Sequence, residues 1–201
     1  FLKQWSRSMP PAQFGNSYLN FLSTHDGIGM RPLEGILPDD EINKFINTLQ
    51  TSGALLTYRV SQKKKTVYEV NTTLLDALKE TYKGKDNYRI KRFILAHEML
   101  FAMEGMPAVY IQNLVGAVND FKKFKNTNAN RSVNRTNWNY IKLCNLIEKS
   151  SSLNNKIYSS IIKLIKLRIK QPAFHPNATQ FTLQLQSYLF GVWRQSIDRS
   201  Q

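Results

Sequence analysis

The tetrapeptide Thr24-His25-Asp26-Gly27 sets an imidazole beside a carboxylate, where the short apolar run 18–22 breaks into glycine. A strand that ends in this way puts both side chains at the mouth of a sheet, which is where α/β barrels carry their chemistry. A carboxylate and an imidazole at such a mouth suit sugar chemistry. A structural interpretation fits equally well, in which Asp26 caps the following turn and His25 is only its neighbour. Spacing alone leaves both interpretations open.

The elements that would position this pair form an α/β unit. Apolar residues at helical spacing make residues 86–104 the clearest helix of the chain, and Gly105 ends the pattern. The predicted order is a strand at 21–23, a long insertion at 27–85, this helix at 86–104 and a second, buried strand at 108–112. Two strands joined through a helix in this way are predicted to run parallel.

Shorter elements fill the rest of the chain. The insertion should hold one helix, which starts at the signal Pro38-Asp39-Asp40. It should also hold a short strand at 66–71 and a short helix that starts near Thr73. A polar loop is predicted at 113–138, followed by helices at 139–149 and 154–170. The last predicted element is a hairpin of residues 181–185 and 188–193.

Two further motifs have competing interpretations. His97-Glu98 would open a zinc-binding helix only with a second histidine at the position of Phe101, so no metal site is predicted. Arg131 and Arg135 stand four residues apart in a polar segment. Arginines there can pair with sugar hydroxyls, phosphate or carboxylate, and a solvated loop would show the same pattern.

The net charge of +14, from 28 Lys and Arg against 14 Asp and Glu, can attract nucleic acid or anionic lipid. A non-catalytic basic module that binds nucleic acid or a membrane surface is therefore the second hypothesis. The lysines are spread along the chain, and the only tight run, residues 63–65, is predicted to be a solvated loop. No run of 18 apolar residues occurs, so no membrane span is predicted. The single Cys144 is expected to be buried and inert, and it fits a reducing cytoplasm.

Five segments along the chain carry a family resemblance. They are FLSTHDGIGMRPLEGIL (21–37), VYEVNTTLLDAL (67–78), EGMPAVYIQNLVGAVND (104–120), NRSVNR (130–135) and RIKQPAFHPNATQFTLQL (168–185). Together the first four resemble the sucrose phosphorylase group of the α-amylase superfamily, glycoside hydrolase family 13. The fifth is more similar to relatives that act on glucosylglycerate or similar compatible solutes. The resemblance covers nearly the whole chain.

The resemblance implies the C-terminal portion of a (β/α)₈ TIM barrel and the start of a C-terminal all-β domain. Residues 21–25 would be strand seven and residues 108–112 strand eight. Residues 1–26 would be a connection and strand seven, and residues 27–85 a small acceptor-side subdomain. Residues 86–170 would hold barrel helix seven, strand eight and helix eight. Residues 171–201 would begin the β domain.

The family reaction is retaining glucosyl transfer to phosphate, with phosphate as co-substrate and without a cofactor or a metal. Asp26 matches the carboxylate that binds glucose hydroxyls and stabilises the transition state as the ring flattens and becomes positive. His25 matches the neighbouring histidine, and Arg131 matches an arginine that reaches the donor glucose. Tyr68 and Glu69 match the mobile acceptor loop, where sucrose phosphorylases carry Tyr-Gln. The Glu in this chain argues against sucrose as substrate.

The family's nucleophile and general acid come from strands four and five, and no residue of this chain matches them. Two strands of eight cannot close a barrel. The chain is therefore interpreted as a cytoplasmic fragment that is inactive alone and whose physical partner is the missing N-terminal barrel half. The two hypotheses differ in one distance: Arg131 should lie within a side-chain length of Asp26 in a phosphorylase, whereas in a basic module the cations should line one outer face.

Overall fold

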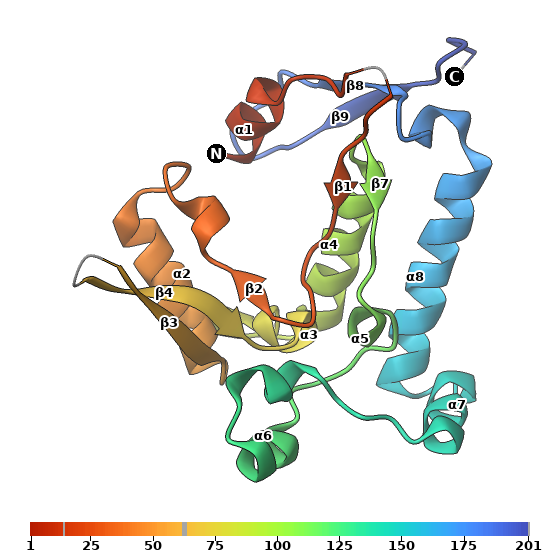
Figure 1. Cartoon of the computed structure of the whole chain (residues 1–201). Coiled ribbons are helices and arrows are strands. Elements are labelled where there is room, and N and C mark those ends of the chain that lie inside the picture. The colour runs from red at the N-terminus through yellow and green to blue at the C-terminus, as the bar shows by residue number, and fades with distance from the viewer. Residues whose placement is uncertain (14, 62–63, 201) are drawn as a thin grey trace.

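The computed structural model describes residues 1–13, 15–61 and 64–200, with the side chains of 61 and 64 left out. Two long helices, α4 and α8, lie side by side and flank a short central strand pair (Figure 1). The helices are α1 Leu2–Ser8, α2 Asp39–Thr51, α3 Leu74–Ala77, α4 Arg89–Ala102, α5 Ile111–Leu114, α6 Phe121–Thr127, α7 Tyr140–Glu148 and α8 Leu153–Lys170, with 3-10 turns η1 Arg31–Leu33, η2 Asn130–Asn134 and η3 Pro172–Phe174. The strands are β1 Leu19–Asn20, β2 Ile28–Gly29, β3 Leu55–Ser61, β4 Lys64–Asn71, β5 Glu80–Thr81, β6 Gly84–Lys85, β7 Met106–Pro107, β8 Thr179–Thr182 and β9 Val192–Gln195.

The central strands β1 and β7 pair in parallel, as the sequence predicts. Their bounds differ from the prediction, because each contributes only two residues and both lie before the expected strands. Pro107 has no N–H to donate, and the chain enters α5 at Ile111, inside the expected second strand. In the described chain these two strands pair only with each other, so the barrel itself stays a prediction.

The helix α4 confirms the clearest helical prediction, with ends trimmed by local contacts. Asp86 accepts from Tyr88 N at 2.8 Å and pairs with Arg92 at 2.8 Å, so the residues before the helix form a bend rather than a turn of helix. At the other end the helix stops at Ala102, before an extended Met103, so the prediction that Gly105 ends it was wrong in detail. Gly105 has a φ of +100°, and a Cβ there would lie 2.5 Å from Tyr18 O, so glycine lets the chain that enters β1 approach.

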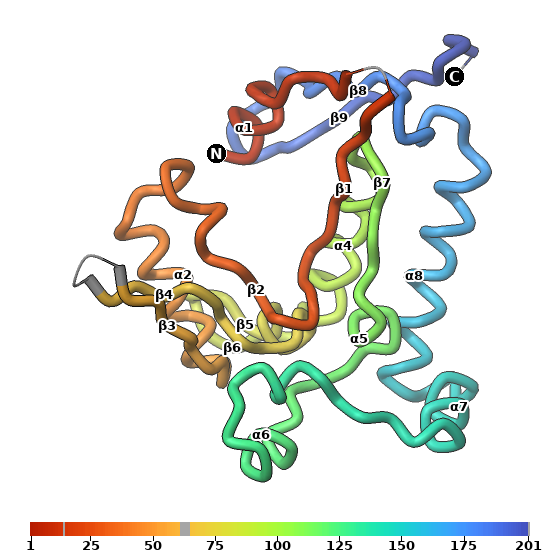
Figure 2. Tube along the Cα trace, viewed as in Figure 1, coloured from red at the N-terminus to blue at the C-terminus, as the bar shows by residue number. Residues whose placement is uncertain are grey.

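The insertion folds into a three-stranded antiparallel sheet, β2-β4-β3, with α2 packed against it (Figure 2). The helix at 39–51 and a strand over 66–71 are confirmed, and Thr73 caps the short α3 as predicted. The strands β2, β3, β5 and β6 were not predicted. The adjacent Leu55 and Leu56 and a register shift after Thr57 interrupt the period of two that would have marked β3.

The C-terminal helices and hairpin follow the prediction with shifted bounds. Asn139 and Ser152 cap α7 and α8, whose predicted positions are confirmed. The hairpin pairs Phe181 with Trp193. Strand β8 begins two residues before the predicted strand 181–185, and β9 ends two residues after the predicted strand 188–193. Cys144 is only partly buried, which contradicts the expected buried thiol, because none of the residues of α7 is buried. The expected loop at 113–138 was wrong in part, because it contains α5, α6 and η2.

His97 lies in the core that α4 and α8 share, and its side chain has no solvent exposure. Its Nδ1 lies 2.8 Å from Phe93 O, and its ring is 4.5 Å from the Phe93 ring. Its Nε2 has no partner within the described residues. Burial lowers the pKa of His97, because a charged imidazolium would lose its hydration there.

We expect His97 to make stability fall in acid. The unfolded chain takes up a proton below pH ~6.5 that the folded chain resists, so the free energy of unfolding should drop as pH falls, by at most ~1.4 kcal/mol per pH unit. Urea unfolding between pH 5 and pH 8 measures this. His97→Phe should flatten the pH dependence, whereas His175→Phe, at an exposed histidine, should retain it. A slope that survives His97→Phe would contradict the assignment.

Candidate active site

Asp26 and His25 stand in the middle of a tight turn at the end of the central sheet. Thr24 N donates to Gly27 O at 3.4 Å, and Gly27 N donates to Thr24 O at 3.2 Å. Gly27 has a φ of +112°, and a Cβ there would lie 2.5 Å from Val70 O. Glycine therefore lets the turn press against the backbone of β4. The predicted strand end is wrong in detail, because residues 24–27 form this turn beyond β1.

One oxygen of Asp26 contacts three side-chain nitrogens. Arg135 Nη2 donates to its Oδ1 at 3.0 Å, and Arg131 Nη1 and His25 Nε2 lie 2.9 Å and 3.3 Å from the same oxygen. Its Oδ2 has no hydrogen bond within the described residues, and about a third of the side chain is exposed. The carboxylate is thus fixed through one oxygen and open through the other. This arrangement suits a group that holds a sugar hydroxyl.

Arg131 joins the turn to the sheet of the insertion. Its Nε donates to Glu69 Oε2 at 3.0 Å and its Nη2 to Glu69 Oε1 at 2.5 Å, while Nη1 contacts Asp26. The hydrogen bonds that Arg131 donates to Glu69, with weaker contributions from the negative charges of Glu69 and Asp26, raise the pKa of Arg131 above its ordinary value. The Glu69 side chain is only 6% exposed, so its charge depends on this partner.

The structure joins four of the five sequence-predicted residues through side-chain contacts. Arg131 on η2 contacts both Asp26 and Glu69 on β4, and His25 is the exposed neighbour of Asp26. Tyr68 precedes Glu69 on β4 and is 40% exposed, and no side-chain hydrogen bond or ion pair joins it to the other four in the described chain. The predicted closeness of Arg131 and Asp26 is confirmed by their contact. The roles of these residues stay predictions.

Sequence reasoning missed three residues of the site. Arg135 was seen only as one of two arginines four apart, yet its Nε also donates to His25 O at 2.7 Å. Asn71 and Asn134 are buried and donate to backbone carbonyls of the turn. The segment NRSVNR carried a signal, because η2 has about three residues per turn and brings its polar side chains near one place.

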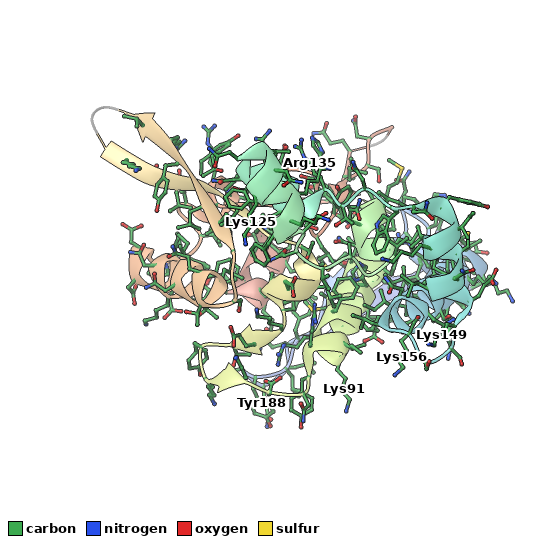
Figure 3. The ribbon with its side chains drawn as sticks, turned by 90° about the horizontal axis from the view of Figure 1, so that it is seen from below. Lys91, Lys125, Arg135, Lys149, Lys156 and Tyr188 are labelled. Carbon is green, nitrogen blue, oxygen red and sulfur yellow. The ribbon has the colours of Figure 1, made fainter. Side chains whose placement is uncertain are left out.

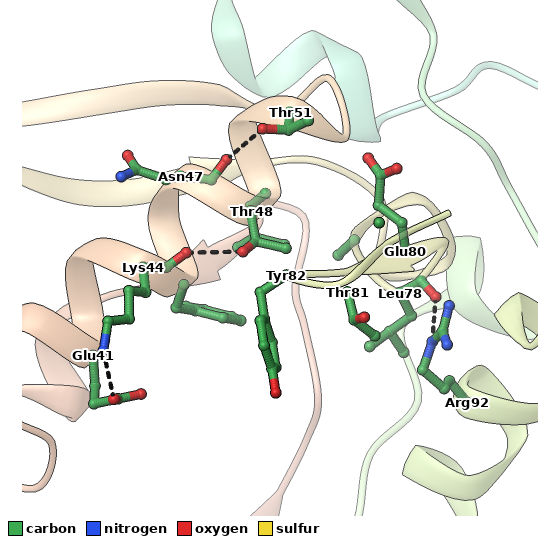
Figure 4. A pocket seen from close by; sticks show the side chains of 14 residues that line it. Glu41, Lys44, Asn47, Thr48, Thr51, Leu78, Glu80, Thr81, Tyr82 and Arg92 are labelled. Carbon is green, nitrogen blue, oxygen red and sulfur yellow. Dashed lines mark hydrogen bonds and ion pairs between the residues drawn. The ribbon is translucent and has the colours of Figure 1, made fainter. Parts of the chain in front are cut away.

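A large cleft of about 870 Å³ lies elsewhere, between α2 and the β5–β6 hairpin, and contains none of the residues around Asp26. Two of its charged side chains already have partners: Lys44 donates to Glu41 at 3.1 Å, and Arg92 donates to the backbone carbonyl of Leu78 at 2.9 Å (Figure 4). Within the described residues no group of three His, Cys, Asp or Glu side chains could hold a metal ion. The Asp26 cluster is therefore the stronger candidate site.

Comparisons with known proteins agree with the geometry. Over 180 residues the chain is 34% identical to the glucosylglycerate phosphorylase of Escherichia coli K12, a match that covers 89% of the chain and 32% of the relative. All 201 residues of the chain align with the glucosylglycerate phosphorylase of Spirochaeta thermophila at 29% identity, and they cover 34% of that relative. No protein-family model matches the chain.

A solved structure agrees with these relatives. The crystal structure of sucrose 6F-phosphate phosphorylase from Thermoanaerobacter thermosaccharolyticum matches with a TM-score of 0.75 at 25% identity, over 92% of the chain and 35% of that protein. The chain thus has a mixed α/β fold that matches part of a solved phosphorylase structure. It is similar to the sucrose and glucosylglycerate phosphorylases, and it spans about a third of the length of the curated relatives it matches.

The bond between Glu69 and Arg131 should contribute measurably to stability. We expect a double-mutant cycle of Glu69→Gln and Arg131→Gln to give a coupling of about 1–2 kcal/mol, because a nearly buried carboxylate would lose charged hydrogen bonds. Urea unfolding of the four proteins measures it. The more exposed pair Arg59 and Glu34, 2.9 Å apart, is the control and should couple by ~0.5 kcal/mol or less. Equal coupling in both cycles would contradict the structural importance of Glu69.

Proposed function

We propose that this chain carries the transition-state-stabilising and acceptor-side part of a retaining α-glucosyl phosphorylase, which forms α-glucose 1-phosphate from a glucoside and phosphate. The observation that carries the proposal is the Asp26 carboxylate, held through one oxygen by two arginines and a histidine and open at the other. The relatives named for glucosylglycerate favour that substrate. Glucosylglycerol and sucrose are the alternatives, with sucrose disfavoured by Glu69.

In this function Asp26 acts by binding the reacting sugar more tightly as it becomes cationic. Its free Oδ2 accepts a hydrogen bond from a glucose hydroxyl, and its negative charge faces the positive charge that develops on the sugar ring. Arg131 and Arg135 fix its direction. His25 hydrogen-bonds the same sugar, and Tyr68 and Glu69 border the acceptor. Phosphate is the co-substrate, and the residues in the site call for no cofactor.

The nucleophile and the general acid of a retaining enzyme stand about 5–5.5 Å apart. They belong in this proposal to the rest of the barrel, the physical partner of the chain. The apolar side chains of the central strand pair support such a partner, because several are exposed: Leu19 at 62%, Phe21 at 55% and Met106 at 48%.

The proposed location is the cytoplasm, with a small glucoside and phosphate as the partners of the site. No helix in the described ranges is long and apolar enough to cross a membrane. The alternative of a basic binding module has no support among the relatives. In Figure 3, Lys125 on α6 lies apart from Lys91, Lys149 and Lys156, which belong in turn to α4, to the residue after α7, and to α8. Of the run 63–65, residue 63 lies outside the described residues, and residues 64–65 belong to β4 rather than to the predicted loop.

A phosphorolysis assay tests the reaction and the substrate. The complete protein that carries this chain should release glucose 1-phosphate from glucosylglycerate faster than from glucosylglycerol or sucrose, because Glu69 replaces the glutamine of the sucrose enzymes. The 201 residues alone should release none, since they lack the two carboxylates that make and break the bond. Reactions without phosphate are the control. Fastest release from sucrose would overturn the substrate order, and release by the isolated chain would refute the need for a partner.

Asp26→Asn should lower kcat by roughly 10²–10³-fold while KM changes little, because the lost charge acts mainly in the transition state. Steady-state kinetics of the complete protein measure both constants. Asp40→Asn is the matched control, because Asp40 is an exposed carboxylate on α2 that pairs only with Lys44 among the described residues. It should leave both constants unchanged. An unchanged kcat in Asp26→Asn would remove Asp26 from the catalytic machinery.

A further inference from the structure

The turn that presents Asp26 stands between two strands that do not pair with each other. Strand β1 pairs with β7 and β2 pairs with β4, so no hairpin ladder holds the turn in place. Within the turn, Thr24 and Gly27 exchange two backbone hydrogen bonds, of 3.4 Å and 3.2 Å. Side chains that bond to the carbonyls of the turn can therefore add to its support.

Side chains from two distant segments supply that support. Asn134 Nδ2 donates to His25 O at 3.0 Å and to Thr24 O at 3.3 Å. Asn71 Nδ2 donates to Asp26 O at 2.7 Å. Three successive carbonyls of the turn thus each accept from a side-chain amide: Asn134 on η2 donates to two of them, and Asn71 on β4 donates to the third.

Both amides are buried, and Asn71 is held at both ends. Asn71 has no exposure, and its Oδ1 accepts from Thr57 Oγ1 at 2.6 Å. Asn134 is 1% exposed, and the Tyr110 hydroxyl donates to its backbone carbonyl at 3.2 Å, while its side-chain Oδ1 has no partner within the described residues. The side chain of Asn134 is therefore bonded to the turn alone, and losing those bonds would leave buried polar groups unpaired.

We propose that Asn134, with Asn71 as a second support, is a positioning residue that fixes the turn of residues 24–27 and so sets the place of the Asp26 carboxylate. The proposal rests on the proposed function, in which Asp26 stabilises the transition state. Neither amide touches the Asp26 carboxylate, so each acts through the backbone. A displacement of ~1 Å at a catalytic group can cost about 10²-fold in rate.

Kinetics of Asn134→Ala in the complete protein test the proposal. We expect kcat to fall by roughly 10–100-fold with KM for the glucoside unchanged, because a misplaced Asp26 loses interactions made mainly in the transition state. The matched control is Asn154→Ala on α8, where the amide donates to Val115 O at 2.6 Å, away from the turn. It removes the same kind of bond and should leave kcat unchanged. An equal loss of kcat in both variants overturns the proposal.

Amide hydrogen exchange at Gly27 gives a readout that needs no activity. Gly27 N donates to Thr24 O, whose other partner is Asn134, so Asn134→Ala should speed its exchange about tenfold relative to wild type and to Asn154→Ala. If Asn134→Ala does not fold, Asn134→Asp keeps the size, removes the donor and should show the same effects. An unchanged exchange rate at Gly27 overturns the proposal. If the wild-type protein forms no glucose 1-phosphate, the proposed function fails, and exchange still decides the role of Asn134.

Discussion

The double contact of the Arg131 guanidinium is the interaction on which the site depends. Glu69 is almost buried on β4 and needs a counter-charge, whereas Asp26 is partly exposed in the turn. A single planar cation satisfies both, because its fork of donors can bind one carboxylate at two points and reach another. The insertion, the turn and η2 can therefore meet at this place without leaving a buried charge unpaired. Gly27 permits the close approach, and Asn71 and Asn134 maintain it.

The same arrangement links the two sides of the site. Glu69 and Asn71 stand two residues apart on β4, so they point to the same face of the strand. Glu69 holds Arg131, and Asn71 holds the backbone of Asp26 and also donates to Glu69 Oε2 at 3.3 Å. A change at the acceptor-side residue Glu69 would thus reach Asp26 by two routes, through Arg131 and through Asn71. Two carboxylates and two arginines balance within the cluster, so the local charge is far lower than the chain's net +14 suggests.

The sequence predicted those elements whose signal is contained in their own residues. The helices α2, α4, α7 and α8 carry apolar residues at a helical period or a capping residue at their start, so the sequence predicts their positions, and only their ends differ. Strands β1 and β7 were misplaced because a strand's limits depend on its ladder partner, and here each has only two paired residues. His25, Asp26, Tyr68, Glu69 and Arg131 came from a family resemblance rather than from spacing. Asn71 carries no local signal, and Asn134 has only the polar spacing of its segment, because their roles are set by carbonyls about 45 and 110 residues away.

The uneven use of the two Asp26 oxygens separates a structural role from a chemical one. A carboxylate that merely capped the turn would direct its oxygens to backbone N–H groups of the same turn. Here Asp26 N donates to the Thr24 hydroxyl at 3.2 Å, while the carboxylate turns outward to the arginines. The carbonyls of the turn are satisfied by the amides of Asn71 and Asn134. Because other residues perform the capping, the turn leaves the Asp26 carboxylate with one oxygen oriented and the other open, which is the condition that binding a sugar hydroxyl requires.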